Sequence, residues 1–212
     1  MQKAEIVKIL SNVSLFKELP KEDIELISEV ITYKAFEAGK VFIEEGVEGN
    51  EAYVILSGLT KVYRITPEGK EMYLAFRVPG ETVGEFALLD DLPRSAHVKT
   101  IHKSEMLVIP KKEFVRIIKK SPSVAMGIIK MLAKRIRENI ALTQDNETRR
   151  LRDRMLSILE RVSSYFPNQE ISMTHEELAD ILGATRPRVT EALHELVNSK
   201  KIKLSHKKIT VL

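Results

Sequence analysis

Short strand-like runs separated by glycines constrain the first half of this chain more than any other feature. The runs are rich in β-branched and aromatic residues, which favour strands. They span residues 41–43, 53–56, 61–65, 72–76 and 106–109. Glycines fall around these runs, where a chain that reverses direction needs a permissive backbone. They are Gly39, Gly46, Gly58, Gly69 and Gly80. Several short strands at this spacing predict a closed or nearly closed antiparallel β structure.

Helical spacing replaces this pattern on either side. Apolar residues recur at helical intervals before residue 30, and residues 111–142 contain neither strand alternation nor clusters of turn residues. A further amphipathic helix begins near Leu151 and ends near Pro167. The polar stretch 143–148 before it predicts a hinge. We therefore expect the chain to divide into residues 1–110, 111–143, 144–148 and 149–212.

Composition limits the chemistry of the chain. With 43% hydrophobic and 30% charged residues in 212, it has the balance of a soluble globular protein. It contains no cysteine, so disulfides, thiolate zinc sites and cysteine-held iron–sulfur clusters are excluded. No apolar run approaches the ~20 residues of a membrane helix, and charges follow Met1 too soon for a signal peptide. We expect a cytoplasmic protein that does not bind membranes.

Positive charge is concentrated at the C-terminal end. From Arg186 onward, seven lysines and arginines stand against two glutamates, a net charge of +5 in a chain whose total is +4. A basic end on a near-neutral body indicates an anionic partner.

The C-terminal region has the pattern of two short helices joined by a turn. Thr174 followed by Glu177 is a capping box that starts the first helix, and Gly183 ends it. Thr185 can cap a second helix, with Pro187 in its first turn, where a missing N–H is harmless. Two short helices around a glycine-containing turn predict a helix-turn-helix.

The second of these helices carries side chains suited to the major groove of DNA. Arginine can bridge guanine O6 and N7, and glutamate can accept from cytosine N4. Residues 203–205 and 209–211 flank a basic tip, which predicts a hairpin, or wing, able to reach a phosphate backbone. The predicted DNA-contacting residues are Thr174, Thr185, Arg186, Arg188, Thr190, Glu191 and Lys207. Double-stranded DNA is therefore the expected partner.

A coiled-coil seam precedes the hinge. Ile129, Leu132, Ile136 and Asn139 follow a 3–4–3 spacing, which is typical of two-stranded coiled coils and predicts a homodimer. The seam is under three heptads long, so a helix that packs on its own domain stays open as the alternative. A two-fold dimer would read an inverted-repeat operator.

The segment around Gly84 carries the strongest signal for a ligand. Gly84 lets a ligand approach the backbone, and a short helix that begins there would aim its N–H groups at a phosphate. Arg94 supplies a charged fork for the same anion and Ser95 a hydroxyl, while the Glu85 carboxylate suits a sugar hydroxyl. The alternative is a glycine turn followed by an arginine that pairs with one of the aspartates before it.

This segment resembles the phosphate-binding cassette of cyclic-nucleotide-binding domains. The shared pattern is G-E-hydrophobic-A-L at 84–88, then P-R-S-A at 93–96. The start with Leu15 and Phe16, the glycine-punctuated strands, the long helix and the helix-turn-helix are similar to the cyclic-AMP receptor branch of the Crp/Fnr regulators. The resemblance implies an α+β fold: an N-terminal jelly-roll-like β-roll over 1–110, a dimerisation helix and a C-terminal winged helix-turn-helix.

The resemblance also implies roles for the cassette residues. The backbone of Gly84 and Glu85, with Arg94 and Ser95, would hold a cyclic phosphate, and the Glu85 carboxylate would hold the ribose 2′-hydroxyl. Polar residues of the long helix meet the purine in this family, which implies Asn139. The implied ligand-binding residues are Gly84, Glu85, Phe86, Arg94, Ser95 and Asn139. The implied effector is cyclic AMP or another cyclic nucleotide, and RNA polymerase is an implied partner.

The sequence departs from the family at several of these places. Ile140 stands where that branch has a serine beside the purine, so adenine identity does not follow from the cassette. Pro187 replaces a common base-reading glutamate and Glu191 a common arginine, which leaves Arg186 as the best candidate for a guanine contact. A short link at 166–169 replaces a longer loop that touches RNA polymerase in the family.

Three other functions compete with this interpretation. A cupin-type metalloenzyme would need clustered ligands, but His97 and His102 are five residues apart and the other histidines are C-terminal. A haem sensor of the same family could use either histidine as an axial ligand, although the cassette favours a nucleotide. A regulator that needs no ligand also stays open. We expect no catalytic residue, no metal ligand and no cofactor.

Overall fold

The computed structural model describes residues 3–13, 16, 19–205 and 208–212. The chain forms two compact units, which we call the N-terminal unit (residues 1–62 and 75–137) and the C-terminal unit (residues 63–74 and 138–212). Within the described residues, no helix is long and apolar enough to cross a membrane.

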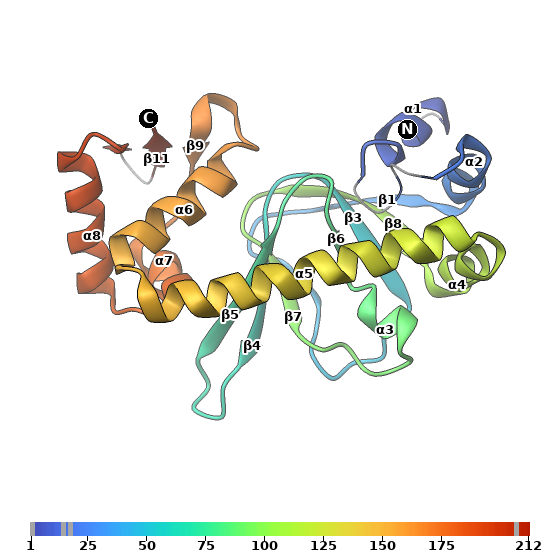
Figure 1. Cartoon of the computed structure of the whole chain (residues 1–212), viewed down its shortest axis with the longest axis horizontal. Coiled ribbons are helices and arrows are strands. Elements are labelled where there is room, and N and C mark those ends of the chain that lie inside the picture. The colour runs from blue at the N-terminus through green and yellow to red at the C-terminus, as the bar shows by residue number, and fades with distance from the viewer. Residues whose placement is uncertain (1–2, 14–15, 17–18, 206–207) are drawn as a thin grey trace. The chain divides into compact units, whose positions relative to one another are not determined.

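Two four-stranded sheets, counted over the described residues, organise the first half of the chain (Figure 1). The first sheet consists, in order, of β1 (Thr32–Phe36), β8 (Ser104–Pro110), β3 (Glu51–Ser57) and β6 (Thr82–Val83). The second consists of β2 (Val41–Ile43), β7 (His97–Thr100), β4 (Thr60–Ile65) and β5 (Glu71–Arg77). Every strand predicted from the glycine-bounded runs lies within one of these strands, and the β1–β8, β3–β8, β3–β6 and β2–β7 pairs are antiparallel.

Two central strands are buried on both faces. Successive side chains of a strand point to opposite faces. Val54 of β3 therefore belongs to the core under the helices, whereas its neighbour Ile55 packs in a second cluster with Ile43 and Val98 of the other sheet. The side chains of β8 alternate in the same way. The first sheet is thus held between the second sheet and the helices.

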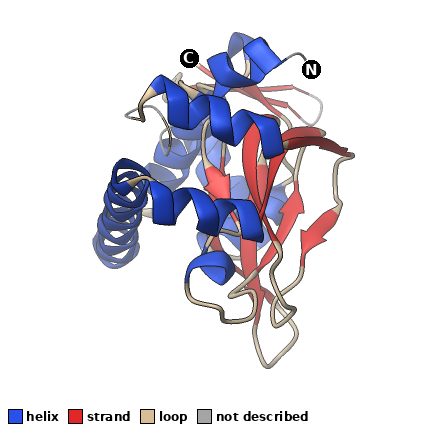
Figure 2. Cartoon of the chain, turned by 90° about the vertical axis from the view of Figure 1, so that its right-hand side faces the viewer, coloured by secondary structure: helices blue, strands red, loops and turns tan. Residues whose placement is uncertain are grey.

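The helices of the N-terminal unit cover the outer face of the first sheet. They are α1 (Lys3–Leu10), α2 (Lys21–Val30), α4 (Lys111–Lys120) and the first part of α5 (Pro122–Thr148). Leu10, Ile27, Phe114 and Ile128 from these helices share one buried cluster with strands β3 and β8. In Figure 2 the strands are red and these helices blue. A one-turn helix, α3 (Phe86–Leu89), follows β6.

The helix predicted over 111–143 is divided in two. Ser121 ends α4 in an extended conformation, with φ −123° and ψ 103°, because a residue before proline avoids the helical region. Pro122 then begins α5, where its missing N–H is tolerated. Residues 144–148, predicted as a hinge, are helical, and the break between α5 and the next helix falls at residues 149–150. A hinge near this break stays a prediction.

The C-terminal unit contains the predicted helix-turn-helix and wing. Its elements after α5 are α6 (Leu151–Ser163), the 3-10 turn η1 (Pro167–Gln169), β9 (Glu170–Ile171), α7 (His175–Leu182), α8 (Arg186–Asn198), β10 (Ile202–Ser205) and β11 (Lys208–Val211). The strands form an antiparallel sheet in the order β10-β11-β9. Leu159, Leu178 and Leu193 are fully buried where α6, α7 and α8 meet.

Local signals set the ends of α7. The predicted capping box is formed, since Thr174 Oγ1 accepts from the Glu177 N–H at 3.1 Å and Glu177 Oε2 accepts from the Thr174 N–H at 2.7 Å. Gly183 ends α7 with φ 59°, in the left-handed region that favours glycine. These two caps place the start of α8 directly after a tight turn.

Candidate functional site

The cassette begins where β6 turns into α3. Gly84 has φ 83°, and a Cβ at this position would lie 2.7 Å from Arg94 Nη1 and 2.9 Å from Ile43 Cδ1. A Cβ on Gly49, in the loop before β3, would lie 2.8 Å from Arg94 Cζ. Both glycines therefore provide the space that the Arg94 side chain occupies.

Arg94 is only 8% exposed. Its Nη1 donates to the Gly84 carbonyl at 2.5 Å, and its Nη2 donates to the Glu51 carbonyl at 2.6 Å. Burial lowers the pKa of Arg94, whereas the nearby Tyr53, Glu51 and Glu85 raise it. Because its two backbone contacts are neutral carbonyls, the guanidinium gives this region a positive potential that suits an anion.

The aspartates before Arg94 contact other groups. Asp91 pairs with Lys111 at 2.9 Å, and Asp90 Oδ1 accepts from the Leu92 N–H at 3.1 Å. The structure therefore differs from the alternative in which Arg94 simply pairs with an aspartate of its own loop.

Glu85 is a buried carboxylate with one oxygen satisfied. Its side chain is almost fully buried, and its Oε1 pairs with Arg135 of α5. Arg135 also donates to the Thr82 carbonyl at 2.5 Å. Glu85 Oε2 has no hydrogen-bond partner among the described residues. Burying a polar atom without a partner is costly, so Oε2 is suited to accept a hydrogen bond from a bound molecule.

These groups line one cavity of about 60 Å³. Five residues predicted to bind a ligand line it, namely Gly84, Glu85, Phe86, Arg94 and Ser95. Two arginines that the sequence reasoning missed also line it, Arg77 at the end of β5 and Arg135 on α5. Asn139 is exposed and is not among the lining residues, so its contact with a ligand stays a prediction.

The two missed arginines carried little signal in the sequence. Arg135 has the appearance of a solvated cation on a helix flank. Arg77 directly follows the apolar run at 72–76, and that charge is the one sign that could have indicated it. Within the described part of the chain, no group of three or more acidic or histidine side chains could hold a metal ion. His97 Nδ1 accepts from the Glu45 N–H at 3.3 Å.

The predicted DNA-contacting residues gather at the start of α8. Arg186, Arg188 and Glu191 are exposed. Thr190 is half-buried, and its hydroxyl donates to the Arg186 carbonyl at 3.0 Å and lies 2.9 Å from His175 Nδ1. These contacts hold Thr190 within the unit, whereas the two arginines and the glutamate face solvent.

The other predicted DNA contacts have different local roles. Thr174 makes the capping box of α7. Thr185 takes the N-cap position of α8, although its side chain makes no cap hydrogen bond there. Lys207 lies outside the described residues. Lys208, its neighbour, pairs with Glu170 of β9.

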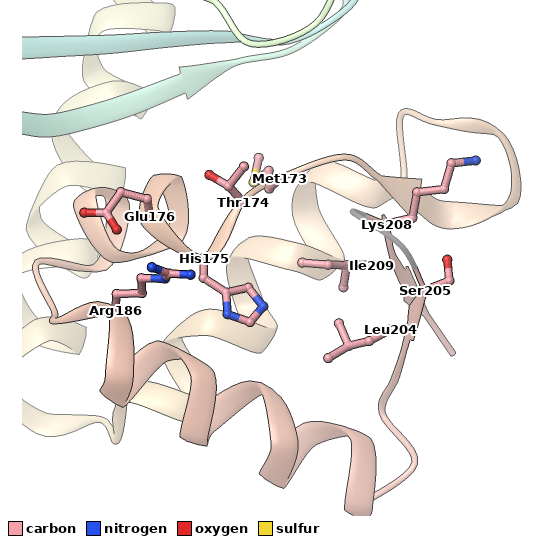
Figure 3. A pocket seen from close by; sticks show the side chains of 9 residues that line it. All are labelled: Met173, Thr174, His175, Glu176, Arg186, Leu204, Ser205, Lys208 and Ile209. Carbon is pink, nitrogen blue, oxygen red and sulfur yellow. The ribbon is translucent and has the colours of Figure 1, made fainter.

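A pocket of about 370 Å³ opens between the start of α7, the start of α8 and the wing. Figure 3 shows Arg186 and His175 on one side of this pocket and Leu204 and Ile209 of the wing on the other. The Lys208 side chain points away from His175 in the same view. His175 sits in the first turn of α7, and its sequence pattern is that of an ordinary surface residue, so it was not predicted.

Both halves of the chain match known sequence families. Residues 33–121 match the cyclic nucleotide-binding domain, and residues 149–212 match the Crp-like helix-turn-helix domain. The chain belongs to the Crp/Fnr family. It is a Crp-like transcription regulator with a cyclic nucleotide-binding domain, and its relatives are regulators and not enzymes, as predicted.

Relatives of this Crp/Fnr regulator align over almost its whole length. The cyclic AMP receptor protein of Thermus thermophilus is 28% identical over 190 residues, covering 90% of this chain and 88% of that protein. The CRP-like cAMP-activated global transcriptional regulator of Mycobacterium tuberculosis is 25% identical over 211 residues, covering 96% and 94%.

A solved structure of a putative Crp/Fnr-family transcriptional regulator from Eubacterium rectale has the same fold. Its TM-score is 0.75 at 22% identity, and the match covers 95% of this chain and 94% of that one. The predicted fold class is confirmed: the chain has a β-sheet sensor domain, a long helix and a C-terminal helix-turn-helix.

The α5 helix of this Crp/Fnr regulator has an exposed apolar stripe. Met126, Ile129, Ile136 and Ile140 are each more than half exposed. Leu132, predicted as part of the dimer seam, packs instead against the core of the N-terminal unit. One face of this helix therefore packs on its own domain, as the alternative expected, and a dimer through the exposed face stays a prediction.

Proposed function

We propose that this Crp/Fnr regulator is a homodimer that binds an inverted-repeat operator and responds to a cyclic nucleotide, cyclic AMP or a close analogue, in the cavity of its N-terminal unit. The observation that carries the effector is a buried guanidinium, Arg94, in the same cavity as the buried acceptor Glu85 Oε2. The two relatives named for cyclic AMP support the same class of effector.

The phosphate half of the site consists of Arg94, Ser95 and the start of α3. The backbone N–H groups at Glu85 and Phe86 begin this helix, where no preceding carbonyl of the helix accepts from them. Arg94 adds a charge-assisted fork, and its two carbonyl contacts keep the guanidinium in one orientation. Ser95 is exposed at the same cavity and offers a hydroxyl.

The sugar half of the site is Glu85 Oε2. With Oε1 held by Arg135, Oε2 accepts from the ribose 2′-hydroxyl of the proposed effector. A hydrogen bond to a charged group contributes about 1.5–3 kcal/mol, so 2′-deoxy cyclic AMP is expected to bind at least tenfold more weakly than cyclic AMP. Equal affinity for both nucleotides would remove this role for Glu85.

Dimerisation is proposed through the exposed stripe of α5. Met126, Ile129, Ala133, Ile136 and Ile140 follow a 3–4–3–4 spacing, the period of a two-stranded coiled coil. This seam replaces the predicted one at Leu132 and keeps Ile129 and Ile136 from it. Asn139 is exposed beside Ile140 and is proposed to lie at the edge of this seam.

DNA recognition is proposed for the exposed start of α8. Arg186 suits guanine and Glu191 suits cytosine, while Arg188 can reach bases or phosphates. The pocket bounded by Arg186, His175 and the wing has the cation and the imidazole needed to hold a backbone phosphate. Two copies would enter successive major grooves about 34 Å apart.

Ligand and DNA are proposed to communicate through α5. This helix carries Arg135, which contacts Glu85 in the cavity, and one residue later Ile136 of the proposed seam. A ligand that binds one arrangement of the dimer better shifts the population toward it, by no more than its differential affinity. As a transcription regulator the protein is further proposed to act in the cytoplasm with RNA polymerase.

Calorimetric titration of the full-length protein with cyclic AMP and cyclic GMP tests the effector. Arg94→Leu removes the charged fork and is expected to weaken binding by about 2 kcal/mol or more, roughly thirtyfold. Arg116→Leu is the matched control, because Arg116 lies on α4, pairs with Glu113 and does not line the cavity. Unchanged affinity in Arg94→Leu would contradict the phosphate site, and no binding by the wild type would leave a regulator that needs no such ligand.

Titration of a palindromic operator with and without the nucleotide tests the switch. The two titrations are done at one salt concentration, because phosphate contacts make DNA affinity depend on salt. We expect the nucleotide to tighten operator binding by about 5- to 150-fold, and linkage requires DNA to tighten nucleotide binding by the same factor. Equal operator affinity in both titrations would leave a DNA-binding dimer without the switch.

A further inference from the structure

Glu51, the first residue of β3, lies against the proposed effector site. Its backbone carbonyl accepts from Arg94 Nη2 at 2.6 Å, and a Cβ on Gly84 would lie 3.3 Å from the same oxygen. The side chain of Glu51 therefore starts from a residue that already touches the guanidinium of the proposed phosphate site. A carboxylate that paired with Arg94 would compete with an anionic ligand for that guanidinium.

Other groups hold this carboxylate. Lys34 Nζ of β1 donates to Glu51 Oε1 at 3.0 Å and to Oε2 at 2.8 Å. The Tyr53 hydroxyl donates to Oε2 at 2.7 Å. The hydrogen bonds of Arg94 go to the backbone carbonyl oxygens of Gly84 and Glu51 instead. The carboxylate thus has partners on the sheet, while the guanidinium is held only by neutral groups.

We propose that Lys34 and Tyr53 hold the Glu51 carboxylate away from Arg94 and so keep the guanidinium available for the phosphate of the effector. The proposal rests on the effector site proposed above and adds two positioning residues to it. Neither of them lines the cavity, and both act through Glu51.

The first sheet brings these side chains together. Successive side chains of a strand point to opposite faces, so Glu51 and Tyr53 lie on the same face of β3. Tyr53 is buried in the cluster between the two sheets, and its ring centroid lies 5.0 Å from that of Phe42 on β2. Lys34 Nζ lies 6.0 Å from the centroid of the same Tyr53 ring. The packed ring fixes the Tyr53 hydroxyl, and with it the direction in which the Glu51 carboxylate points.

The charges of Glu51 and Arg94 influence each other. Burial raises the pKa of the Glu51 carboxyl, but the hydrogen bonds from Lys34 and Tyr53 and the charges of Lys34 and Arg94 outweigh it and lower that pKa. Burial lowers the pKa of Arg94, whereas nearby groups, Glu51 among them, raise it. The carboxylate and the guanidinium therefore attract each other, and loss of Lys34 frees the carboxylate to move toward Arg94.

Calorimetry with cyclic AMP and variants at position 34 tests the proposal. Lys34→Met frees the carboxylate and is expected to weaken binding about three- to fivefold, the size expected for a partly exposed charge pair. Lys34→Arg keeps the charge and is expected to bind more tightly than Lys34→Met. Lys103→Met is the matched control and is expected to bind as the wild type does, because Lys103 pairs with Glu37 at 2.9 Å and does not line the cavity.

A second substitution separates this role from a structural one. The proposal expects Glu51→Gln, when it is added to Lys34→Met, to recover affinity, because no freed carboxylate then remains to pair with Arg94. If Lys34 only supported the fold, the second substitution would deepen the loss. Unchanged affinity in Lys34→Met, or a further loss in the double variant, would overturn the proposal.

Thermal unfolding without ligand tests the same competition when the proposed effector is wrong. If the wild type binds neither cyclic AMP nor cyclic GMP, the proposed function fails, but the pairing of Glu51 can still be measured. Lys34→Met is expected to lower the unfolding temperature more in an Arg94→Leu background than in a protein that keeps Arg94, because Arg94 can then no longer take over the freed carboxylate. An equal fall in both backgrounds would contradict the assignment independently of the effector.

Discussion

A methyl group added at Gly49 gives a sharp test of how the cassette is built. The Cβ of Gly49→Ala would lie 2.6 Å from Ala87 Cβ and 2.8 Å from both Cζ and Nε of Arg94. Real Cβ atoms essentially never lie under 3.0 Å from such atoms, so the groups around residue 49, the side chain of Arg94 among them, have to shift. The backbone of Gly49 is not in the left-handed region, so the substitution acts through this contact and not through local strain.

The expected loss follows from the contacts that Arg94 makes. Its guanidinium is held by the Gly84 and Glu51 carbonyl oxygens at 2.5 and 2.6 Å, and a shift of the side chain lengthens these bonds and misplaces the guanidinium. The misplaced guanidinium then loses a hydrogen bond to the phosphate of the proposed effector. Losing one hydrogen bond to a charged group costs about 1.5–3 kcal/mol, which corresponds to a fall of about tenfold to a hundredfold in affinity for cyclic AMP.

Calorimetry and thermal unfolding together check this prediction. Gly39→Ala is the control, because its backbone has φ 80° and nothing lies within 4 Å of the added Cβ. That variant is expected to lose stability, since alanine is strained at positive φ, but to keep its affinity for the nucleotide. The reasoning is refuted if Gly49→Ala binds cyclic AMP as tightly as the wild type.

Three further predictions concern the dimer, the DNA and the response to acid. Ile136→Glu places like charges across a two-fold axis in the proposed seam, so sedimentation is expected to show monomers, and a stable dimer would contradict the seam. Arg186→Ala is expected to cost about 1–3 kcal/mol in operator affinity and to relax the preference for one base pair. Titration of single-base variants of the operator measures this preference. An equal loss of affinity on every operator sequence would make Arg186 a phosphate contact instead. Burial raises the pKa of the Glu51 carboxyl, but hydrogen bonds from Lys34 and Tyr53 outweigh it and hold that pKa below its ordinary value. The ionised Glu51 carboxylate therefore stabilises the fold above the ordinary pKa of glutamate, and this stability is lost as the pH falls through the lowered pKa. Glu51→Gln should make the free energy of unfolding fall less steeply at acidic pH. The same fall in the variant and the wild type would refute this.

Much of the fold follows from contacts between neighbours in the chain. The Thr174–Glu177 capping box and the left-handed Gly183 are local, because the groups that hydrogen-bond lie within a few residues of one another. The same holds for the five strand-like runs predicted from the sequence, each of which lies within an observed strand. Strands β1, β6 and β7 were not predicted: β1 and β7 are not bounded by glycines in the same way, and β6 is only two residues long.

The helical region after β8 differs from its prediction at two places. Ser121 and Pro122 divide the predicted helix, although the proline was visible in the sequence. The polar stretch 143–148 suggested a break, yet α5 continues through it. A run of polar residues does not by itself end a helix, because exposed polar side chains leave the backbone hydrogen bonds of the helix intact.

The sequence by itself determined the order of the two domains, the cassette and the basic reading end, since each is carried by contiguous residues. Only the tertiary structure decided which distant groups share the cavity. Arg135 reaches Glu85 across 50 residues, and Arg77 joins them from another sheet. The tertiary structure also packs Leu132 against the core of the N-terminal unit and leaves Ile129 and Ile136 exposed. The physical reason is that a helix presents several faces with similar spacing, and the packing of α5 against the first sheet selects which face is buried.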